Sequence, residues 1–166
     1  HAALETALLQ HIERNHPDIS AVVDPVQFQV PHVNADLHYY GGDPLHGTIL
    51  PSVKAAVDTI RRTAAANTTA LLGLHYVIEG SKNGGRFIVR GLRRAYNLAP
   101  GQGDRSMDPY GDQQPTIWAK FKTDMNARTF DTATCDTIIA SAGDMFDAFY
   151  AVSEDLAKHE NLKDEA

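Results

Sequence analysis

The stretch from residue 71 to residue 96 places the strongest constraint on how this chain folds. It reads LLGLHYVIEGSKNGGRFIVRGLRRAY, and its apolar residues recur at helical spacing on both sides of a glycine-rich run at residues 80–85. Each of the three glycines in that run weakens a helix by about 1 kcal/mol relative to alanine, so a loop between two helices is one interpretation. Because the apolar phase continues across the run, we predict one long helix that is kinked at the glycines. Bare backbone there would let a flat ligand approach the helix closely.

The remaining elements follow from apolar spacing and from helix-start and helix-stop residues. Apolar residues at helical spacing predict helices over residues 2–15, 32–40, 52–66, 116–126 and 132–159, with Ser52 as cap of the third and either Asp131 or Thr132 as cap of the last. Residues 19–31 contain two prolines and read as irregular, with short extended pieces. Residues 97–115 are rich in Gly, Pro and Asp and read as a long loop. The pattern therefore predicts an all-α chain with a single domain over residues 1–166.

Residues 73–85 carry a more specific signal. The run YVIEGSKNGG resembles the distal-helix signature of bacterial heme oxygenases, in particular the YVLEGSxLGG pattern of the branch that accompanies bacteriophytochromes. Further segments resemble this family in the same order along the chain: residues 33–41, the aromatic residues Tyr110, Trp118 and Phe121, and residues 140–156 with Phe146 at the usual aromatic position. Two positions depart from the pattern. Asn83 stands where the family usually has leucine, and Lys82 is also unusual.

The resemblance implies a fold, an activity and a set of partners. The implied fold is a single-domain helical bundle with a glycine-kinked distal helix. The implied activity is oxygen-dependent opening of heme to biliverdin, with release of iron and CO. Heme would be both substrate and cofactor, and electrons would come from an external reductase or ferredoxin. A bacteriophytochrome is a possible recipient of the product.

The resemblance also implies which residues form the site. Gly80, Ser81, Gly84 and Gly85 would form the wall over the porphyrin and steer oxygen to one meso carbon. The residues expected to bind heme are His75, Tyr76, Arg86 and Phe146. Two bland interpretations stay open beside these. The glycines can serve only the close packing of another segment, and most of the arginines near residue 90 can form a solvated helix face.

The iron ligand has two interpretations. If residues 4–8 match a later stretch of the family, the first helix with its ligand histidine is absent from these residues. If residues 1–5 form the ligand motif HxxLE, then His1 binds the iron. His11 and His16, on or just after the same predicted helix, are further candidates.

Two other functions compete with heme cleavage. A relative without the ligand helix would bind heme, a bilin or another protein without turnover. Alternatively, His75 with Glu79 and His32 with Asp36 are pairs four residues apart, a spacing that suits a non-heme iron or dimetal site. The repeated carboxylate-x-x-His signature of such sites is missing from the sequence.

Composition narrows the class of protein. The net charge of −6 disfavours nucleic acid or an anionic membrane as the main partner. The single cysteine, Cys135, excludes an internal disulfide and fits a reducing compartment, so we expect a cytoplasmic protein. No apolar run approaches the roughly 20 residues of a membrane span.

Overall fold

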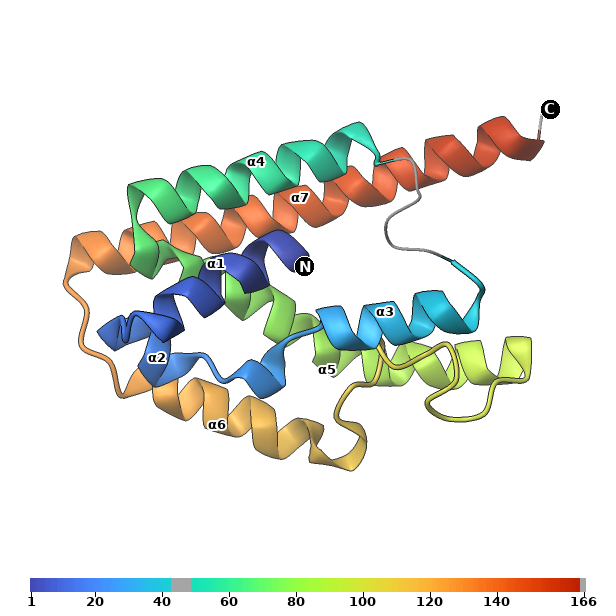
Figure 1. The fold of residues 1–166 in the computed structure, drawn as a ribbon, viewed down its shortest axis with the longest axis horizontal. Helices are drawn as coiled ribbons and strands as arrows, with labels where there is room; N and C mark the ends of the chain where they lie inside the picture. The colour runs from blue at the N-terminus through green and yellow to red at the C-terminus, as the bar shows by residue number, and fades with distance from the viewer. Residues whose placement is uncertain (43–48, 165–166) are drawn as a thin grey trace. The chain divides into compact units, whose positions relative to one another are not determined.

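The computed structural model describes residues 1–42 and 49–164, and regular structure in these residues is helical throughout (Figure 1). This confirms the predicted all-α class. The sequence also predicts a loop at residues 43–51, after the helix at 32–40, and most of that range lies outside the described residues. Within the described residues, no helix is both long and apolar enough to cross a membrane.

The helices follow one another with short connections, apart from residues 40–50 between α3 and α4 and the segment between α5 and α6. In chain order they are α1 (Ala2–Glu13), α2 (Pro17–Val22), η1 (Pro25–Gln27), α3 (Val30–Tyr39), α4 (Pro51–Ala66), η2 (Thr68–Ala70), α5 (Leu71–Tyr96), η3 (Gly111–Gln113), α6 (Gln114–Asn126) and α7 (Thr132–Asp164). The η elements are single turns of 3₁₀ helix.

The chain forms two compact units. Unit 1 comprises His1–Gly47 and Ile78–Thr129, and unit 2 comprises Thr48–Val77 and Phe130–Ala166. The boundary falls inside α5, whose first turns belong to unit 2 and whose remainder belongs to unit 1. The single-domain bounds of 1–166 stay a prediction.

Helix α5 runs without interruption through the glycine-rich run, as the apolar phase predicted. The alternative of a loop between two helices is therefore wrong. The preceding turn, η2, is capped by Asn67, whose side-chain oxygen accepts a hydrogen bond from the Thr69 amide at 3.1 Å. This cap allows the chain to turn sharply out of α4 and to begin α5 at once.

Two other predicted elements differ from the structure. Residues 19–31 are only partly extended: Val23, Asp24 and Phe28 have extended backbone, whereas Pro17–Val22 form α2 and Pro25–Gln27 form η1. Pro17 stands in the first turn of α2, and a second proline, Pro25, opens η1, because proline suits the first turn of a helix. Ser52 is not the cap of α4, which begins one residue earlier at Pro51. The Ser52 amide instead donates to the Asp155 carboxylate at 3.0 Å.

In unit 1, carboxylates that accept backbone amides hold the short elements together. Glu5 of α1 accepts the amides of Gln29 and Val30, at 2.6 Å and 3.1 Å, and so caps the start of α3. Asp36 of α3 accepts the amides of Arg105 and Ser106, at 2.8 Å and 2.7 Å. The long segment after α5 is therefore anchored on α3, although its composition reads as a loop.

In unit 2, α4 lies along α7 (Figure 1). The start of α5 approaches α7 more closely than a side chain would allow. A Cβ built on Gly73 would lie well under 3.0 Å from both the Ile138 carbonyl oxygen and the Ser141 hydroxyl. That hydroxyl also donates to the Ala70 carbonyl at 2.7 Å. Gly73 is thus required by helix contact.

We expect Gly73→Ala to lower the free energy of unfolding by about 1–3 kcal/mol, because backbone and a bonded hydroxyl must move to admit the methyl group. Gly143→Ala on α7 is the matched control, since nothing lies within 4 Å of its Cβ position. The control should gain about 1 kcal/mol from helix propensity. Urea unfolding of both variants measures the difference, and equal stabilities would contradict the close contact.

Candidate functional site

One face of α5 in unit 1 is exposed and carries almost no side-chain bulk. It consists of Ser81, Gly84, Ile88, Gly91 and Ala95, spaced by three and four residues so that they form one stripe along the helix. We call these five residues the open stripe. Nothing lies within 4 Å of the Cβ positions of Gly84 and Gly91, and the Ile88 side chain is 61% exposed. A flat apolar ligand can reach bare backbone here.

The other two glycines of the run face packed groups. A Cβ on Gly85 would lie well under 3.0 Å from the Met107 carbonyl oxygen, so this glycine lets the segment after α5 touch the helix backbone. Gly80 faces the indole of Trp118, whose ring lies 3.5 Å from the Cβ position. That indole stacks on Phe121 of α6, with ring centroids 5.6 Å apart. The close-packing interpretation therefore applies to Gly85, whereas Gly84 faces open space.

Behind the open stripe, α5 carries a buried polar cluster formed by Glu79, Lys82, Tyr110 and the Gln27 carbonyl. The Lys82 ammonium donates to the Gln27 carbonyl at 2.7 Å, to Glu79 Oε2 at 2.6 Å and to the Tyr110 hydroxyl at 2.7 Å. The Tyr110 hydroxyl in turn donates to Glu79 Oε2 at 3.0 Å. All three protons of the ammonium are thereby bonded.

The cluster changes the proton affinities of its members. Burial lowers the pKa of Lys82, and the neighbouring Glu79 carboxylate opposes that shift. Burial, followed by the same carboxylate, raises the pKa of Tyr110. Glu79 is fully buried, and no described residue bonds its second oxygen, Oε1.

Other polar groups near the stripe are bonded to the helix itself. The Ser81 hydroxyl donates to the Ile78 carbonyl at 2.8 Å, and the Asn83 amide donates to the Gly80 carbonyl at 3.0 Å. The guanidinium groups of Arg86 and Arg90 lie 5.9 Å and 5.8 Å from the ring of the exposed Phe87. Cations and apolar surface therefore adjoin each other beside the stripe.

A third cation of this segment, Arg93, is committed to the chain. It pairs with the buried Asp104 and lies 3.4 Å from Asp108. Together with the contacts at Tyr110 and Met107, this pair fixes the segment after α5 along the helix.

Three of the residues predicted to bind heme belong to unit 2. His75 is buried, with 1% of its side chain exposed, whereas Tyr76 beside it is 41% exposed. Phe146 of α7 is 61% exposed and shares one face of that helix with Ile139 and Tyr150, which are exposed as well. This face is a second exposed apolar surface. The binding roles of the three residues stay predictions.

His1 directly precedes α1, and its role as iron ligand also stays a prediction. Among the described residues, no group of three or more His, Cys, Asp or Glu is placed to hold a metal ion. The carboxylates of the dimetal alternative are engaged elsewhere, Glu79 with Lys82 and Asp36 with two backbone amides. The structure thus gives that alternative no support.

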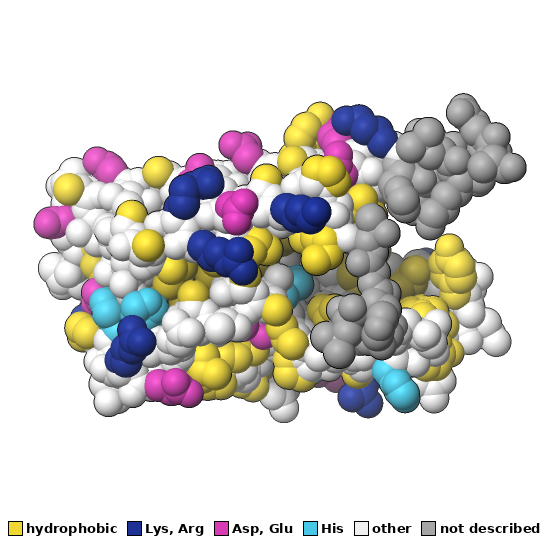
Figure 2. All heavy atoms as spheres, turned by 45° about the horizontal axis from the view of Figure 1, so that its top comes forward, with side chains coloured by type: hydrophobic (Ala, Val, Ile, Leu, Met, Phe, Trp, Pro, Cys, Tyr) yellow, Lys and Arg dark blue, Asp and Glu magenta, His cyan; other side chains and the backbone are white. Residues whose placement is uncertain are grey.

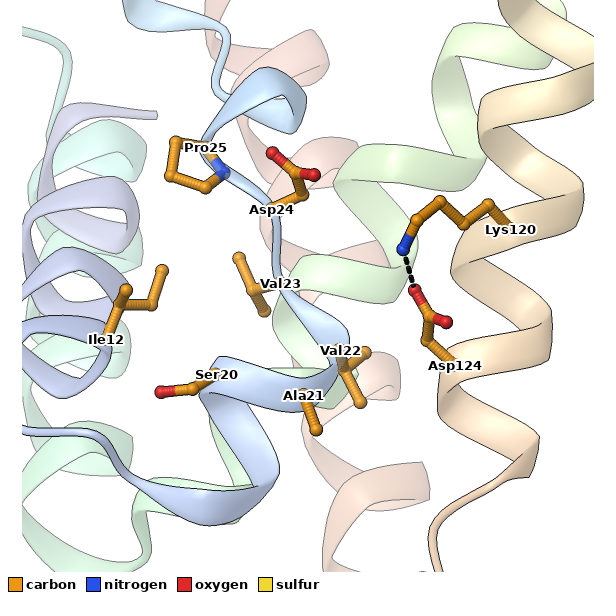
Figure 3. Close-up of a pocket in the computed structure, with 9 residues that line it drawn as sticks. All are labelled: Ile12, Ser20, Ala21, Val22, Val23, Asp24, Pro25, Lys120 and Asp124. Atoms are coloured by element: carbon orange, nitrogen blue, oxygen red, sulfur yellow. Dashed lines mark hydrogen bonds and ion pairs between the residues drawn. The ribbon is translucent and has the colours of Figure 1, made fainter.

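Unit 1 also has a hollow of about 270 Å³ next to α2, but none of the predicted site residues lines it (Figure 3). Its walls are Ile12, the end of α2 and the Lys120–Asp124 ion pair of α6, whose charged atoms are 2.5 Å apart.

On the face in Figure 2, acidic and basic side chains are interspersed with hydrophobic ones. This face therefore has no large field of one sign.

The family follows from comparison with known proteins. A family model described as heme oxygenase matches residues 1–155. The match covers nearly the whole chain, so the chain belongs to the heme oxygenase family. Among curated proteins, none matches this chain.

Solved structures of heme oxygenases share the fold. Heme oxygenase-2 of Synechocystis sp. PCC 6803, in complex with heme and NO, is 27% identical with a TM-score of 0.83, over 93% of this chain and 66% of that one. Heme oxygenase-1 of the same cyanobacterium, in complex with heme, is 23% identical with a TM-score of 0.77, over 97% and 77% of the two chains. Heme oxygenase from Leptospira interrogans is 19% identical with a TM-score of 0.76, over 88% and 74%. This chain thus spans slightly less than two thirds of the first of these proteins.

Sequence reasoning found the helix that carries the stripe but missed the contacts that hold it. Lys82 stood out only as a departure from the family pattern, and Tyr110 only as part of an aromatic segment. A lysine at the buried phase of an amphipathic helix, three residues after a glutamate, is the signal that would have indicated the pair. The carboxylates of Glu5 and Asp36 gave no such signal, because their partners are distant backbone amides.

The raised pKa of Tyr110 makes a pH dependence testable. An unfolded tyrosine loses its proton near pH 10, whereas folded Tyr110 keeps it, so its stabilising contribution is present below about pH 10 and lost above it. We expect the stability advantage of the wild type over Tyr110→Phe to shrink as the pH rises from about 9 to about 11. The lowered pKa of Lys82 makes stability rise with pH up to about pH 10.5. This contribution is present in both proteins, so it does not account for a change in their difference. Urea unfolding of both proteins across this pH range measures the difference in stability. A difference that stays constant with pH would contradict a raised pKa of the buried Tyr110 hydroxyl.

Proposed function

We propose that this chain is a heme oxygenase that binds heme against the Ser81, Gly84 and Ile88 part of the open stripe and cleaves it to biliverdin, iron and CO. The observation that carries the proposal is Gly84, an exposed glycine in the middle of a helix with open space where its Cβ would be. Glycine costs a helix interior about 1 kcal/mol relative to alanine, and here no packing contact explains it. A flat ligand that touches backbone explains it, and family membership supports heme as that ligand.

The residues of the stripe fit a porphyrin face. Gly84 supplies backbone at contact distance, and Ile88 supplies exposed apolar surface one turn farther along. The Ser81 hydroxyl gives its proton to the Ile78 carbonyl, so its oxygen is left to accept a hydrogen bond from water near the bound ligand. Ser81 thereby serves to orient water and does not act as a nucleophile. Gly85 acts indirectly, by letting Met107 lie close to the helix, whereas a Cβ on Gly80 would make only an ordinary van der Waals contact with Trp118.

Cations beside the stripe suit the carboxylates of heme. Arg86 and Arg90 flank Phe87, and Arg90 is exposed with no carboxylate partner among the described residues. We assign propionate binding to these two arginines. The buried His75 suits this role less well.

The chemistry itself belongs to the bound group. Heme supplies the iron at which oxygen is activated, with electrons from an external reductase or ferredoxin. The task of the chain is to orient the porphyrin, to exclude bulk water and to hold the ordered water at Ser81. Family membership supports an axial histidine, and His1 is our candidate for it.

Addition of hemin to the protein tests binding and turnover separately. We expect a Soret band at stoichiometric hemin, followed by a bilin spectrum and CO release after ascorbate or a reductase is added. A stable Soret band without turnover would instead indicate a heme-binding relative. Failure to bind hemin would refute the proposal.

Gly84→Ala tests the stripe itself. Because the methyl group meets open space, the variant should gain about 1 kcal/mol of stability. The same methyl group would hold a flat ligand away from the backbone, and we expect hemin affinity to fall about tenfold, or about 1.4 kcal/mol. Gly91→Ala is the control, since its Cβ position is equally open but lies two turns farther along. It should gain the same stability and bind hemin normally, and normal binding by Gly84→Ala would contradict the proposed contact.

A further inference from the structure

The buried cluster behind the open stripe has no part in the proposed chemistry, yet it lies within the glycine-rich run. Lys82 is two residues from Gly84, which places it about 160° around the helix axis on the far face. Its side chain is buried, and it connects three separate segments: α5 through Glu79, η1 through the Gln27 carbonyl, and the segment before η3 through Tyr110.

A buried ion pair is a poor way to gain stability. Removing two charges from water costs several kcal/mol each, and an apolar replacement of similar volume is often neutral or stabilising. The Glu79–Lys82 pair also leaves one carboxylate oxygen, Oε1, without a bond from any described residue. Stability alone therefore does not explain the cluster. The best-attested gain from buried polar groups is a defined register between packed elements.

The geometry of the Lys82 cluster fits a role in fixing the register between α5 and the segments packed beside it. Hydrogen bonds have directions, whereas apolar contacts let a helix rotate or slide by small amounts at little cost. Lys82 has acceptors on two segments outside α5 and so fixes the rotation of this part of the helix. Gly85, pressed against the Met107 carbonyl, fixes its distance from the same segment. With both contacts in place, Gly84 points away from the packed side.

We propose that Lys82 is a positioning residue, which through Glu79, Tyr110 and the Gln27 carbonyl holds the glycine-rich run of α5 so that Gly84 presents its backbone to the ligand. The inference rests on the proposed function only for the identity of the ligand. The positioning of the helix is independent of that function, because amide exchange measures it without hemin.

An apolar variant of the cluster tests the proposal. It combines Glu79→Met, Lys82→Met and Tyr110→Phe, so that no charge is left unpaired. We expect a melting temperature equal to or above that of the wild type, a hemin dissociation constant raised about tenfold because fewer molecules hold the competent arrangement, and a broadened Soret band. Without hemin, backbone amides of residues 83–88 should exchange hydrogen about tenfold faster. Lys120→Met is the matched control, because it removes an exposed lysine paired with Asp124. This control should change neither the hemin dissociation constant nor the amide exchange of residues 83–88.

Restoration of the ammonium gives a second test, which does not depend on the apolar variant folding. Lys82→Cys in a Cys135→Ser background is alkylated in denaturant and refolded. Treatment with 2-bromoethylamine restores an ammonium of nearly the original length, and iodoethane adds a neutral group of similar bulk. We expect the aminoethyl form to bind hemin within about twofold of the wild type, and the ethyl form about tenfold more weakly.

The outcomes separate the two proposals. Wild-type hemin affinity and wild-type amide exchange in the apolar variant would overturn the positioning role, as would an equal effect of Lys120→Met or equal binding by the two alkylated forms. If the wild type itself fails to bind hemin, the proposed function is wrong. Amide exchange in the same variants then still decides whether Lys82 positions the helix.

Discussion

The ammonium of Lys82 is the contact on which the arrangement of unit 1 depends. A buried cation must replace its water with hydrogen-bond acceptors, and Lys82 finds three, two of them on segments outside its own helix. The requirement to satisfy one charge thereby brings η1 and the segment around Tyr110 to the same face of α5. Farther along that face, Arg93 imposes the same requirement on Asp104. The polar face of α5, rather than its apolar residues alone, determines what packs beside it.

Because one face of α5 is committed in this way, the opposite face is free. The three glycines of the run then have three different environments: Gly80 adjoins an indole, Gly84 adjoins open space, and Gly85 adjoins a carbonyl. A glycine-rich motif in a sequence cannot distinguish these environments, since each of them excludes or tolerates a Cβ for a different reason. The close-packing interpretation is correct for Gly85, whereas the heme-slot interpretation remains a prediction for Gly84.

The long segment after α5 illustrates how composition misleads. Its Gly, Pro and Asp content reads as a solvated loop, and all three glycines of residues 97–115 have positive φ. However, Asp36 accepts two amides of the segment, Gly103 packs against Tyr39 and Tyr40, and Asp104 is buried. The segment is irregular in backbone but fixed in position, because its polar groups find partners in α3 and α5.

The sequence by itself determined the all-α class, the continuous helix α5 and the family, because apolar periodicity and a glycine signature are local patterns. It placed most helix bounds within a few residues but missed α2 and η1, since prolines that open helices read the same as prolines that break them. Only the tertiary structure decided which glycine is open, where the Lys82 charge is satisfied and what Glu5 and Asp36 bind. Those outcomes depend on pairs of groups up to 70 positions apart in the chain, and no local pattern encodes such a distance.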